Sequence, residues 1–379
     1  MFIIILSTLS ATLSGFLLVQ SLRTTKQYRF PSERLKDLDL SHTPSVTICI
    51  PARNETSAMT SCLEAVISSD YPKLEIIVLD DDSVDNTSTL IKSFAHTGVR
   101  FIKGAPLQEG WMGRNYAYQN LLEAASGKYI FFMSVDIHID RGTISQFIKY
   151  LINHEAEMIS ILPIRRDSFR PSTLFSPLRF FNDLILSTKY NPPTASSAWI
   201  VNRDLFREYA DGFSAYKNNV SPESQISKAF VAKNQYSFLI SPFRSSVNDE
   251  KNWKSQIETS LRIHALTRSE SFLARIAYLL SLAILIAPTF ILTTSIIAHQ
   301  TKTVVFITTL LTELVLMLSY FIYVRLTRPK GNVLQAIIFP LILVQELIIF
   351  VISIVKKSFG TITWKGRNIY PKNPKPKLP

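Results

Sequence analysis

Apolar residues follow two patterns along the chain: long uninterrupted runs near both ends, and short runs separated by polar segments between them. Four long runs could cross a bilayer, and they occupy residues 2–20, 276–298, 303–324 and 333–355. The first two carry no charged residue, the third carries only Glu313, and the fourth only Glu346. The pattern predicts membrane helices at both ends of the chain, around a domain of a different kind.

Basic residues flank these runs unevenly. None precedes the first run, whereas Arg or Lys follows it at positions 23, 26, 29, 34 and 36, and a second group follows the third run at 325, 328 and 330. The positive-inside rule therefore places the region after the first run in the cytoplasm. The first run has no basic residue before it and no small-residue cleavage site after it, which favours an uncleaved anchor over a signal peptide.

The fourth run differs from a simple span. Pro340 interrupts its helical pattern, and Gln345 and Glu346 fall near its centre. The tail after it, residues 356–379, contains basic residues and no acidic ones. A full crossing would place this tail outside the cell, whereas a re-entrant or interfacial hairpin would keep it in the cytoplasm. The positive-inside rule favours the hairpin, and both arrangements stay open.

The central region alternates between two kinds of predicted element. Short apolar runs predict strands at residues 46–50, 75–79, 99–102 and 129–133, and helical spacing occurs at 57–69, 87–95 and 113–125. Strands that alternate with helices are typical of an α/β domain with a mostly parallel sheet. Ligands of such sheets bind beyond the carboxyl ends of the strands.

Polar loops follow three of the four predicted strands. They read PARNE at 51–55, DDDSVD at 80–85 and SVDIH at 134–138. Asp, Ser and Asn also cap helices and form turns, which is the alternative explanation for any one of these loops. Three of them at one edge of a sheet favour a binding site. The sequence contains neither a G-x-G-x-x-G nor a P-loop pattern, which excludes the usual dinucleotide and P-loop sites.

Composition and charge narrow the function classes further. Hydrophobic residues make up 47% of the 379 residues, which excludes a disordered or collagen-like chain. The net charge of +12 comes from 41 Lys and Arg against 29 Asp and Glu, and much of the excess lies beside the apolar runs. We therefore predict a membrane partner and no nucleic acid. The two cysteines, Cys49 and Cys62, form neither a disulfide scaffold nor a zinc site.

Three motifs carry a family resemblance. PARNE, DDDSVDNT and GWMGRNYA, in that order and spacing, resemble membrane-bound family 2 glycosyltransferases of the GT-A fold, and most of all the branch of hopanoid-associated and carotenoid (diaponeurosporenoate-type) enzymes. The tail motif TWKGR at 363–367 is similar to that branch as well. The resemblance implies an α/β fold: a Rossmann-like nucleotide-diphospho-sugar transferase domain with transmembrane helices at both ends. The expected parts are an anchor at 1–22, the GT-A domain at 42–245, an interfacial amphipathic helix at 250–272, a membrane region of two to three spans at 273–356, and a basic tail at 357–379.

The resemblance also implies a nucleotide-diphosphate sugar as donor. Glu55, Asp80 and Asp81 match the family's contacts to the base and ribose, because a carboxylate can accept two hydrogen bonds from a diol. Arg114 stands where the family has a Lys that faces the diphosphate. The implied donor-binding residues are Pro51, Arg53, Glu55, Asp80, Asp81, Asp82, Ser83, Gly110, Trp111, Gly113, Arg114 and Asp136.

The family's metal-binding D-x-D motif is altered here. Its positions read Ser134-Val135-Asp136, so one of the two carboxylates is missing. Asp136, with phosphate oxygens and waters, would still hold Mg²⁺ or Mn²⁺. His138 lies nearby, and we interpret it as an incidental residue at the strand end.

The family's catalytic base is the Asp of an ED pair, and this pair is also altered. The matching stretch, residues 220–226, allows two registers, one of which places Ser at the position of the base and the other Glu223. We prefer Glu223, because an inverting transfer needs a group that takes the proton of the acceptor hydroxyl. The alternative is that Glu223 only begins a helix, where the dipole favours an acidic residue.

Two further segments would face a lipid acceptor. Residues 255–268 have the Trp and basic flanks of an interfacial helix, and residues 169–191 are rich in Phe and Leu, although core packing explains the second segment equally well. The function predicted is an inverting transfer of one sugar from a nucleotide-diphosphate donor to an amphipathic membrane lipid, on the cytoplasmic face of a multi-pass protein of the cell membrane. The Q-x-x-R-W motif of processive relatives is absent, which argues against a polysaccharide synthase. A non-catalytic relative that only binds nucleotide or lipid is the other alternative.

Overall fold

The computed structural model describes residues 1–28, 30, 43–166, 175, 178–242, 246–251, 253–265, 271–327, 333–364 and 367–368. The predicted membrane-flanking residues Arg29, Arg34, Lys36, Arg328 and Lys330, and most of the predicted basic tail, lie outside this part. The chain divides into two compact units. The sheet unit comprises Tyr28–Arg166 and Ser187–Glu250, and the helical unit comprises Met1–Gln27, Asp167–Leu186 and Lys251–Pro379. The sheet unit omits residues 167–186, which fall within the predicted domain limits of 42–245.

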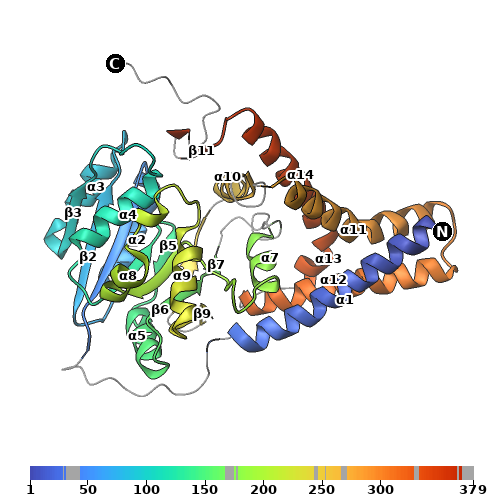
Figure 1. Cartoon of the computed structure of the whole chain (residues 1–379), viewed down its shortest axis with the longest axis horizontal. Coiled ribbons are helices and arrows are strands. Elements are labelled where there is room, and N and C mark those ends of the chain that lie inside the picture. The colour runs from blue at the N-terminus through green and yellow to red at the C-terminus, as the bar shows by residue number, and fades with distance from the viewer. Residues whose placement is uncertain are drawn as a thin grey trace. The chain divides into compact units, whose positions relative to one another are not determined.

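A seven-stranded sheet forms the centre of the sheet unit (Figure 1). Its order is β3 (Val99–Lys103), β2 (Leu74–Asp80), β1 (Val46–Ala52), β4 (Tyr129–Met133), β8 (Ala198–Asn202), β6 (Met158–Leu162) and β9 (Tyr236–Ile240). The pairs β3–β2, β2–β1, β1–β4 and β6–β9 are parallel, and β8 runs antiparallel to both β4 and β6. The four predicted strands are β1 to β4, and the sequence analysis missed β8, β6 and β9.

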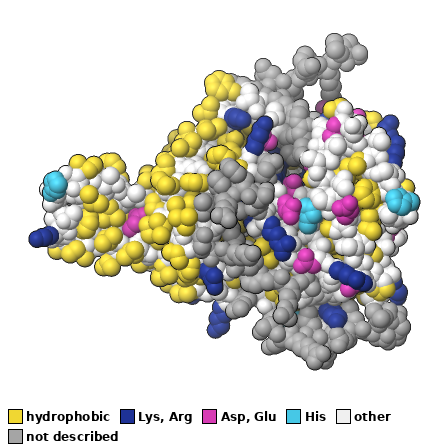
Figure 2. Space-filling model, turned by 180° about the vertical axis from the view of Figure 1, so that it is seen from behind, with side chains coloured by type: hydrophobic (Ala, Val, Ile, Leu, Met, Phe, Trp, Pro, Cys, Tyr) yellow, Lys and Arg dark blue, Asp and Glu magenta, His cyan; other side chains and the backbone are white. Residues whose placement is uncertain are grey.

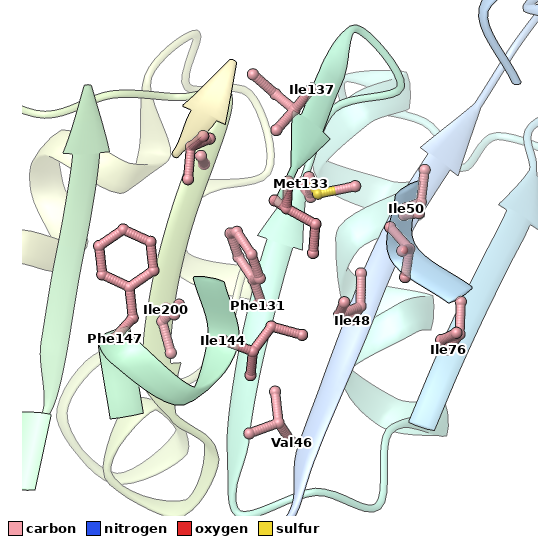
Figure 3. Packing of buried hydrophobic residues seen from close by; sticks show 14 of the residues in the cluster. Val46, Ile48, Ile50, Ile76, Phe131, Met133, Ile137, Ile144, Phe147 and Ile200 are labelled. Carbon is pink, nitrogen blue, oxygen red and sulfur yellow. The ribbon is translucent and has the colours of Figure 1, made fainter. Parts of the chain in front are cut away.

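Both faces of this sheet are buried, which explains why its strands are continuous apolar runs rather than alternating ones. On one face, Val46, Ile48 and Ile50 of β1 pack beside Phe131 of β4 and Phe147 (Figure 3). Helices α2 (Thr56–Ile67), α3 (Thr87–Ser93) and α5 (Thr143–Asn153) supply the rest of that layer. Helices α4 (Gly113–Ala124), α8 (Arg203–Ala210) and α9 (Pro222–Ala232) cover the other face.

A small second sheet joins distant parts of the sheet unit. Its order is β5 (Ile137–Ile139), β10 (Val247–Asp249) and β7 (Ile164–Arg165), with β10 antiparallel to β5 and parallel to β7. Strand β5 begins directly after Asp136, and Glu250 N donates to Asp136 O at 3.1 Å. The chain after β4 is therefore fixed by a strand that lies more than a hundred residues later in the sequence.

Among its described residues, the helical unit contains four helices that are long and apolar enough to cross a membrane: α1 (Phe2–Tyr28), α11 (Phe272–Ile297), α12 (Val304–Thr327) and α14 (Phe339–Ser358). Large apolar side chains such as Leu273, Phe290 and Val304 are exposed on them, and Figure 2 shows how much of this unit's visible surface is hydrophobic. Such a surface is typical of contact with lipid rather than water. The predicted fourth run is split at Ile338 between α13 (Val333–Ile337) and α14, because Pro340 fits the first turn of a helix but not its interior. The side of the membrane on which the tail lies stays a prediction.

Helices α7 (Arg179–Ile185) and α10 (Trp253–Ile263) also belong to the helical unit. On α7, Phe181 is 2% exposed and packs edge-on against Tyr320, Tyr323 and Phe339. This packing supports the core interpretation of that part of residues 169–191. Helix α10 lies in the predicted interfacial segment, with Trp253 44% exposed and Gln256 buried. Short strands β11 (Thr363–Trp364) and β12 (Arg367–Asn368) pair within the tail motif.

Glu346 is the centre of a buried polar network in the helical unit. Its side chain is fully buried, and one carboxylate oxygen lies 2.8 Å from His264 Nε2 and accepts a hydrogen bond from Tyr278 Oη at 3.0 Å. The other oxygen accepts a bond from the backbone N–H of Leu178 at 3.3 Å. Four segments, the residues before α7, the end of α10, α11 and α14, therefore converge on one carboxylate. Ionisable side chains in apolar helices are costly unless they are paired, so the network stabilises the packing of these segments.

Glu346→Ala is expected to destabilise the full-length chain by about 3 kcal/mol, because it leaves His264 and the Leu178 amide without their partner. Glu313→Ala is the matched control, since Glu313 is the other buried acid of these helices and accepts a bond from Thr289 Oγ1 at 3.2 Å. Its expected cost is about 1 kcal/mol. Thermal unfolding of both variants in detergent measures the difference. Equal losses would contradict the special role of Glu346.

Candidate active site

The predicted polar loops meet at one edge of the seven-stranded sheet. Strand β1 lies between β2 and β4, and Ala52, the last residue of β1, is paired in register with Asp80, the last residue of β2. The segment containing Ser134 and Asp136 follows β4 on the other side of β1. All three strands run in the same direction, so their carboxyl ends and the loops after them share this edge.

Hydrogen bonds connect the loop after β1 to the loop after β2. Arg53 Nη1 donates to the carbonyl oxygens of Asp81 and Asp82, the second at 2.9 Å, and its side chain is 11% exposed. Asn54 Oδ1 accepts from Val84 N at 3.0 Å, and Asn54 N donates to Ser83 Oγ at 3.0 Å. Asn54 has a left-handed backbone (φ 51°), which Asn tolerates better than most residues. Arg53 therefore acts within the protein as a clamp between the two loops.

Asp85 fixes the start of two helices. It accepts bonds from Thr56 Oγ1 at 2.6 Å and from Thr87 N at 3.0 Å, so it ties α2 to α3. Partial desolvation acts to raise the pKa of Asp85, but the hydrogen bonds from Thr56 and Thr87 outweigh it and hold the pKa at about 2. The carboxylate is thus ionised at neutral pH. The sequence analysis did not select Asn54 or Asp85, although both lie inside the motifs that it used.

The three consecutive acids after β2 have different surroundings. Asp80 is 3% exposed, and its two carboxylate oxygens accept bonds from Ser83, through N at 3.2 Å and through the hydroxyl, and from the Ser88 hydroxyl. Asp81 is 5% exposed and its N donates to Ala52 O at 2.8 Å, whereas the Asp82 side chain is 79% exposed. Asp80 and Ser83 therefore order the loop. Gly104 completes the packing here, because a Cβ at that position would lie 2.8 Å from Asp80 O.

The GWMGR motif forms a turn and then begins α4. Gly110 has φ 79°, which favours glycine, and Met112 N donates to Lys217 O at 2.7 Å. Trp111 packs against Tyr116 with ring centroids 5.4 Å apart, and the buried Gly113 is the first residue of the helix. Arg114 follows in the first turn, where backbone N–H groups also favour an anion.

Arg114 and Glu223 form a nearly buried ion pair. Arg114 Nη2 lies 2.9 Å from Glu223 Oε2 and also donates to Val220 O at 3.2 Å. The two side chains are 19% and 4% exposed. Glu223 is in the first turn of α9, after Pro222 at its first position. The structure thus joins two residues for which the sequence analysis had predicted separate roles.

Asn115 holds the segment between these two helices, and the sequence analysis missed it. Its amide Nδ2 donates to the carbonyl oxygens of Tyr216 at 2.9 Å, Lys217 at 3.3 Å and Asn219 at 2.7 Å, and the residue is 1% exposed. The signal available in the sequence was the position of Asn115, a polar residue directly after the GWMGR motif. Its neighbours on the helix are buried.

Asn115→Ala is expected to destabilise the chain by about 1–3 kcal/mol, because the carbonyl groups of Tyr216 and Asn219 lose a hydrogen-bond donor, whereas Lys217 O keeps the bond from Met112 N. Donor affinity should fall with it, since segment 216–220 supports Arg114. Asn120→Ala is the matched control on the same helix, because Asn120 Nδ2 donates only to its own helix, at Tyr116 O, 3.0 Å away. Chemical denaturation and nucleotide titration of both variants provide the comparison. If Asn120→Ala lost as much stability and nucleotide affinity as Asn115→Ala, the proposed role of Asn115 would be contradicted.

Asp136 and Glu55 lie near one buried thiol, although they come from different loops. Burial raises the pKa of Cys62, and the charges of Asp136 and Glu55 raise it further. The two carboxylates therefore share one part of the edge. His138 Nε2 lies 3.0 Å from Ser61 Oγ of α2, so its ring is directed at that helix. Within the described ranges, no group of three or more His, Cys, Asp or Glu side chains is arranged to hold a metal ion.

A family model covers most of this unit. Residues 47–210 match the model described as Glycosyl transferase family 2. The match runs from β1 to the end of α8 and includes all of the predicted donor-binding residues, while Glu223 lies beyond it. Residues 47–210 are therefore similar to a family 2 glycosyl transferase domain.

Curated relatives match over shorter stretches. A 4,4'-diaponeurosporenoate glycosyltransferase of Staphylococcus aureus is 29% identical over 133 residues, which is 34% of this chain and 34% of that protein. Glycosyltransferase GlyA of Streptococcus pneumoniae is 24% identical over 113 residues, which is 30% of this chain and 16% of that protein. The chain thus matches about a third or less of the length of these relatives.

A solved structure resembles the whole chain. Mannosyltransferase PcManGT from Pyrobaculum calidifontis, in complex with GDP-Man and Mn²⁺, superposes with a TM-score of 0.55 at 16% identity and covers 94% of this chain and 98% of that one. The likeness confirms the predicted fold: a GT-A-like mixed α/β sheet with apolar helices near the N-terminus and in the C-terminal region.

Proposed function

We propose that this chain is an inverting glycosyltransferase that moves a sugar from a nucleotide-diphosphate donor to a lipid acceptor at the cytoplasmic face of the membrane. One observation carries the proposal. The polar loops after β1, β2 and β4 meet at one edge of a family 2 domain, with a guanidinium and a carboxylate paired in the same unit.

The donor lies across this edge in the proposal. Glu55, Asp81 and Asp82 accept hydrogen bonds from the base and ribose, and Pro51, Arg53, Asp80 and Ser83 shape the loops that carry them. Gly110, Trp111 and Gly113 form the turn that brings the first N–H groups of α4 to the diphosphate. Arg114 supplies the cation, and its planar fork suits phosphate oxygens.

The chemistry requires one proton acceptor. The acceptor hydroxyl attacks the anomeric carbon from the face opposite the diphosphate, and Glu223 receives the hydroxyl proton as the new carbon–oxygen bond forms. The bond from the anomeric carbon to the diphosphate oxygen breaks, and the nucleoside diphosphate leaves with that electron pair. Arg114 and the N-terminus of α4 stabilise the charge that develops on it.

Asp136 is the residue that would hold Mg²⁺ or Mn²⁺. A carboxylate is the oxygen ligand that such hard cations prefer, and phosphate oxygens and waters would complete the coordination because Ser134 replaces the second carboxylate. When bound, the ion neutralises negative charge on the diphosphate.

The acceptor is an amphipathic lipid in the proposal. Four apolar helices surround the domain in the sequence, and one relative is named for a carotenoid acid, which is an apolar chain with a polar end. The sequence lacks the Q-x-x-R-W motif, which favours a single transfer over polymer synthesis.

Membranes that contain the full-length chain test the proposal directly. Incubation with radiolabelled UDP-glucose, UDP-N-acetylglucosamine or GDP-mannose, each with Mg²⁺ or Mn²⁺, should produce a labelled lipid in the organic extract with at least one donor. Membranes with Glu223→Gln serve as the matched control and should lack it. Failure to label lipid with any of the donors would overturn the proposal.

A non-catalytic relative is the second candidate. Two observations favour it. Arg114 and Glu223 are occupied by their nearly buried ion pair, and Ser134 lacks the carboxylate of the D-x-D motif, so fewer charged groups can act on a substrate. Tight binding of a nucleoside diphosphate by membranes that label no lipid would support this candidate.

A further inference from the structure

One guanidinium has two uses in the site. Arg114 is the cation available to the donor diphosphate, and it is also the group that holds Glu223 at 2.9 Å. While Oε2 accepts this bond and only 4% of the side chain is exposed, an acceptor hydroxyl has little access to Glu223. The two roles proposed for this pair therefore conflict in the structure as it stands.

Donor binding resolves the conflict. We propose that Arg114 and Glu223 form a donor-operated switch, in which the diphosphate draws Arg114 away from Glu223 and so makes the carboxylate available as the base. This inference rests on the proposed function. A diphosphate carries more negative charge and more acceptor oxygens than one carboxylate, so it competes well for a guanidinium. A carboxylate that stays buried after losing its cation is a stronger proton acceptor.

The surrounding structure lets the guanidinium move without the backbone. Asn115 fixes segment 216–219 through three carbonyl groups, and Met112 N fixes Lys217 O, so the start of α4 is held independently of the ion pair. Pro222 begins α9 and limits motion of Glu223. The ring of Tyr118 lies 5.8 Å from Arg114 Cζ and offers a second favourable contact for the cation.

The switch gives the reaction an order. The nucleotide sugar binds first, and only then is Glu223 free to take the acceptor proton as the bond to the diphosphate breaks. Without a donor in place, Glu223 stays paired with Arg114, so the base is not offered to an acceptor before the nucleotide sugar has bound. In the paired state one guanidinium nitrogen, Arg114 Nη2, donates both to Glu223 Oε2 and to the Val220 carbonyl, so two hydrogen bonds hold the pair.

Nucleotide affinity tests the switch. The full-length chain in detergent is titrated with UDP and GDP, and with the phosphate-free nucleosides uridine and guanosine. Glu223→Gln should bind the preferred diphosphate roughly tenfold more tightly than the unchanged chain, because Arg114 no longer leaves a charged partner. Nucleoside affinity should stay the same, since the pair faces the phosphates.

Two further variants separate the switch from a general effect of charge. Glu109→Gln removes an exposed acid beside the same motif, and it should not reproduce the gain. In a chain that already carries Arg114→Gln, Glu223→Gln should have no effect on diphosphate affinity. If the Arg114→Gln chain does not fold, Arg114→Lys replaces it, and the gain in diphosphate affinity caused by Glu223→Gln should then be smaller. The switch would be overturned, while the proposed function stands, if Glu109→Gln and Glu223→Gln raised diphosphate affinity equally or if Glu223→Gln did not raise it at all. If no variant binds UDP or GDP, both inferences fail.

Discussion

Glu223→Gln is expected to reduce sugar transfer by roughly 10²–10⁴-fold while the full-length chain still binds its donor, since this is the usual cost of losing a general base. Gln has the same size and can still accept the hydrogen bond from Arg114, but it takes no proton at neutral pH. The alternative role of Glu223, as an acidic residue at the start of α9, predicts a loss of stability of only about 0.3–1 kcal/mol with turnover retained.

These two roles of Glu223 are separated by measuring turnover, diphosphate affinity and thermal stability on the same preparation. Asp204→Asn is a matched control, because Asp204 is also an acid in the first turn of a helix of this unit, at α8, and its partner at 3.1 Å is Arg203. Normal transfer by Glu223→Gln would show that another group is the base, and Asp211, just after α8, would be tested next.

Asp136→Ala should abolish measurable transfer and the response to added Mg²⁺ or Mn²⁺. The variant removes the only carboxylate in the altered D-x-D motif, and charge stabilisation by a metal ion contributes several kcal/mol in the transition state. The backbone bond between Glu250 N and the Asp136 carbonyl should persist in the variant, because it does not involve the side chain.

Ser134→Asp and His138→Ala make this test specific. Ser134→Asp restores the family pattern and should lower the half-saturating concentration of Mn²⁺, because a second anionic ligand strengthens a site for a hard cation. His138→Ala should leave that concentration unchanged, since the ring bonds to Ser61. A metal response retained by Asp136→Ala, or one lost by His138→Ala, would contradict the assignment of the metal site.

Residues that act through local sequence were predicted well. The apolar runs of β1, β2 and β4 are buried on both faces, so burial required them to be continuous and made them visible in the sequence. The predicted interruption at Pro340 follows from the backbone restrictions of a single residue. The order of the motifs then sufficed to predict the GT-A fold.

Residues that act through distant partners were missed. Strand β10 was missed because three residues carry too weak a pattern, and it is stabilised only by pairing with β5 and β7. The role of Asp80 as a ligand for ribose stays a prediction, and the structure adds its bonds to Ser83 and Ser88, which depend on how the loop folds back. The sequence also carries nothing that would pair Asn115 with three carbonyl groups about a hundred residues away.

The sequence by itself determined the long apolar helices, the parallel strands and the polar loops at their ends, because each depends on neighbouring residues and on hydrophobic burial. Only the tertiary structure decided that Arg114 and Glu223 face each other across 2.9 Å, and that Glu346 joins four segments of the helical unit. Such pairs form where long-range packing brings charged groups into places that exclude water, and there an ion must find a partner. The identity of that partner depends on the geometry of the whole fold.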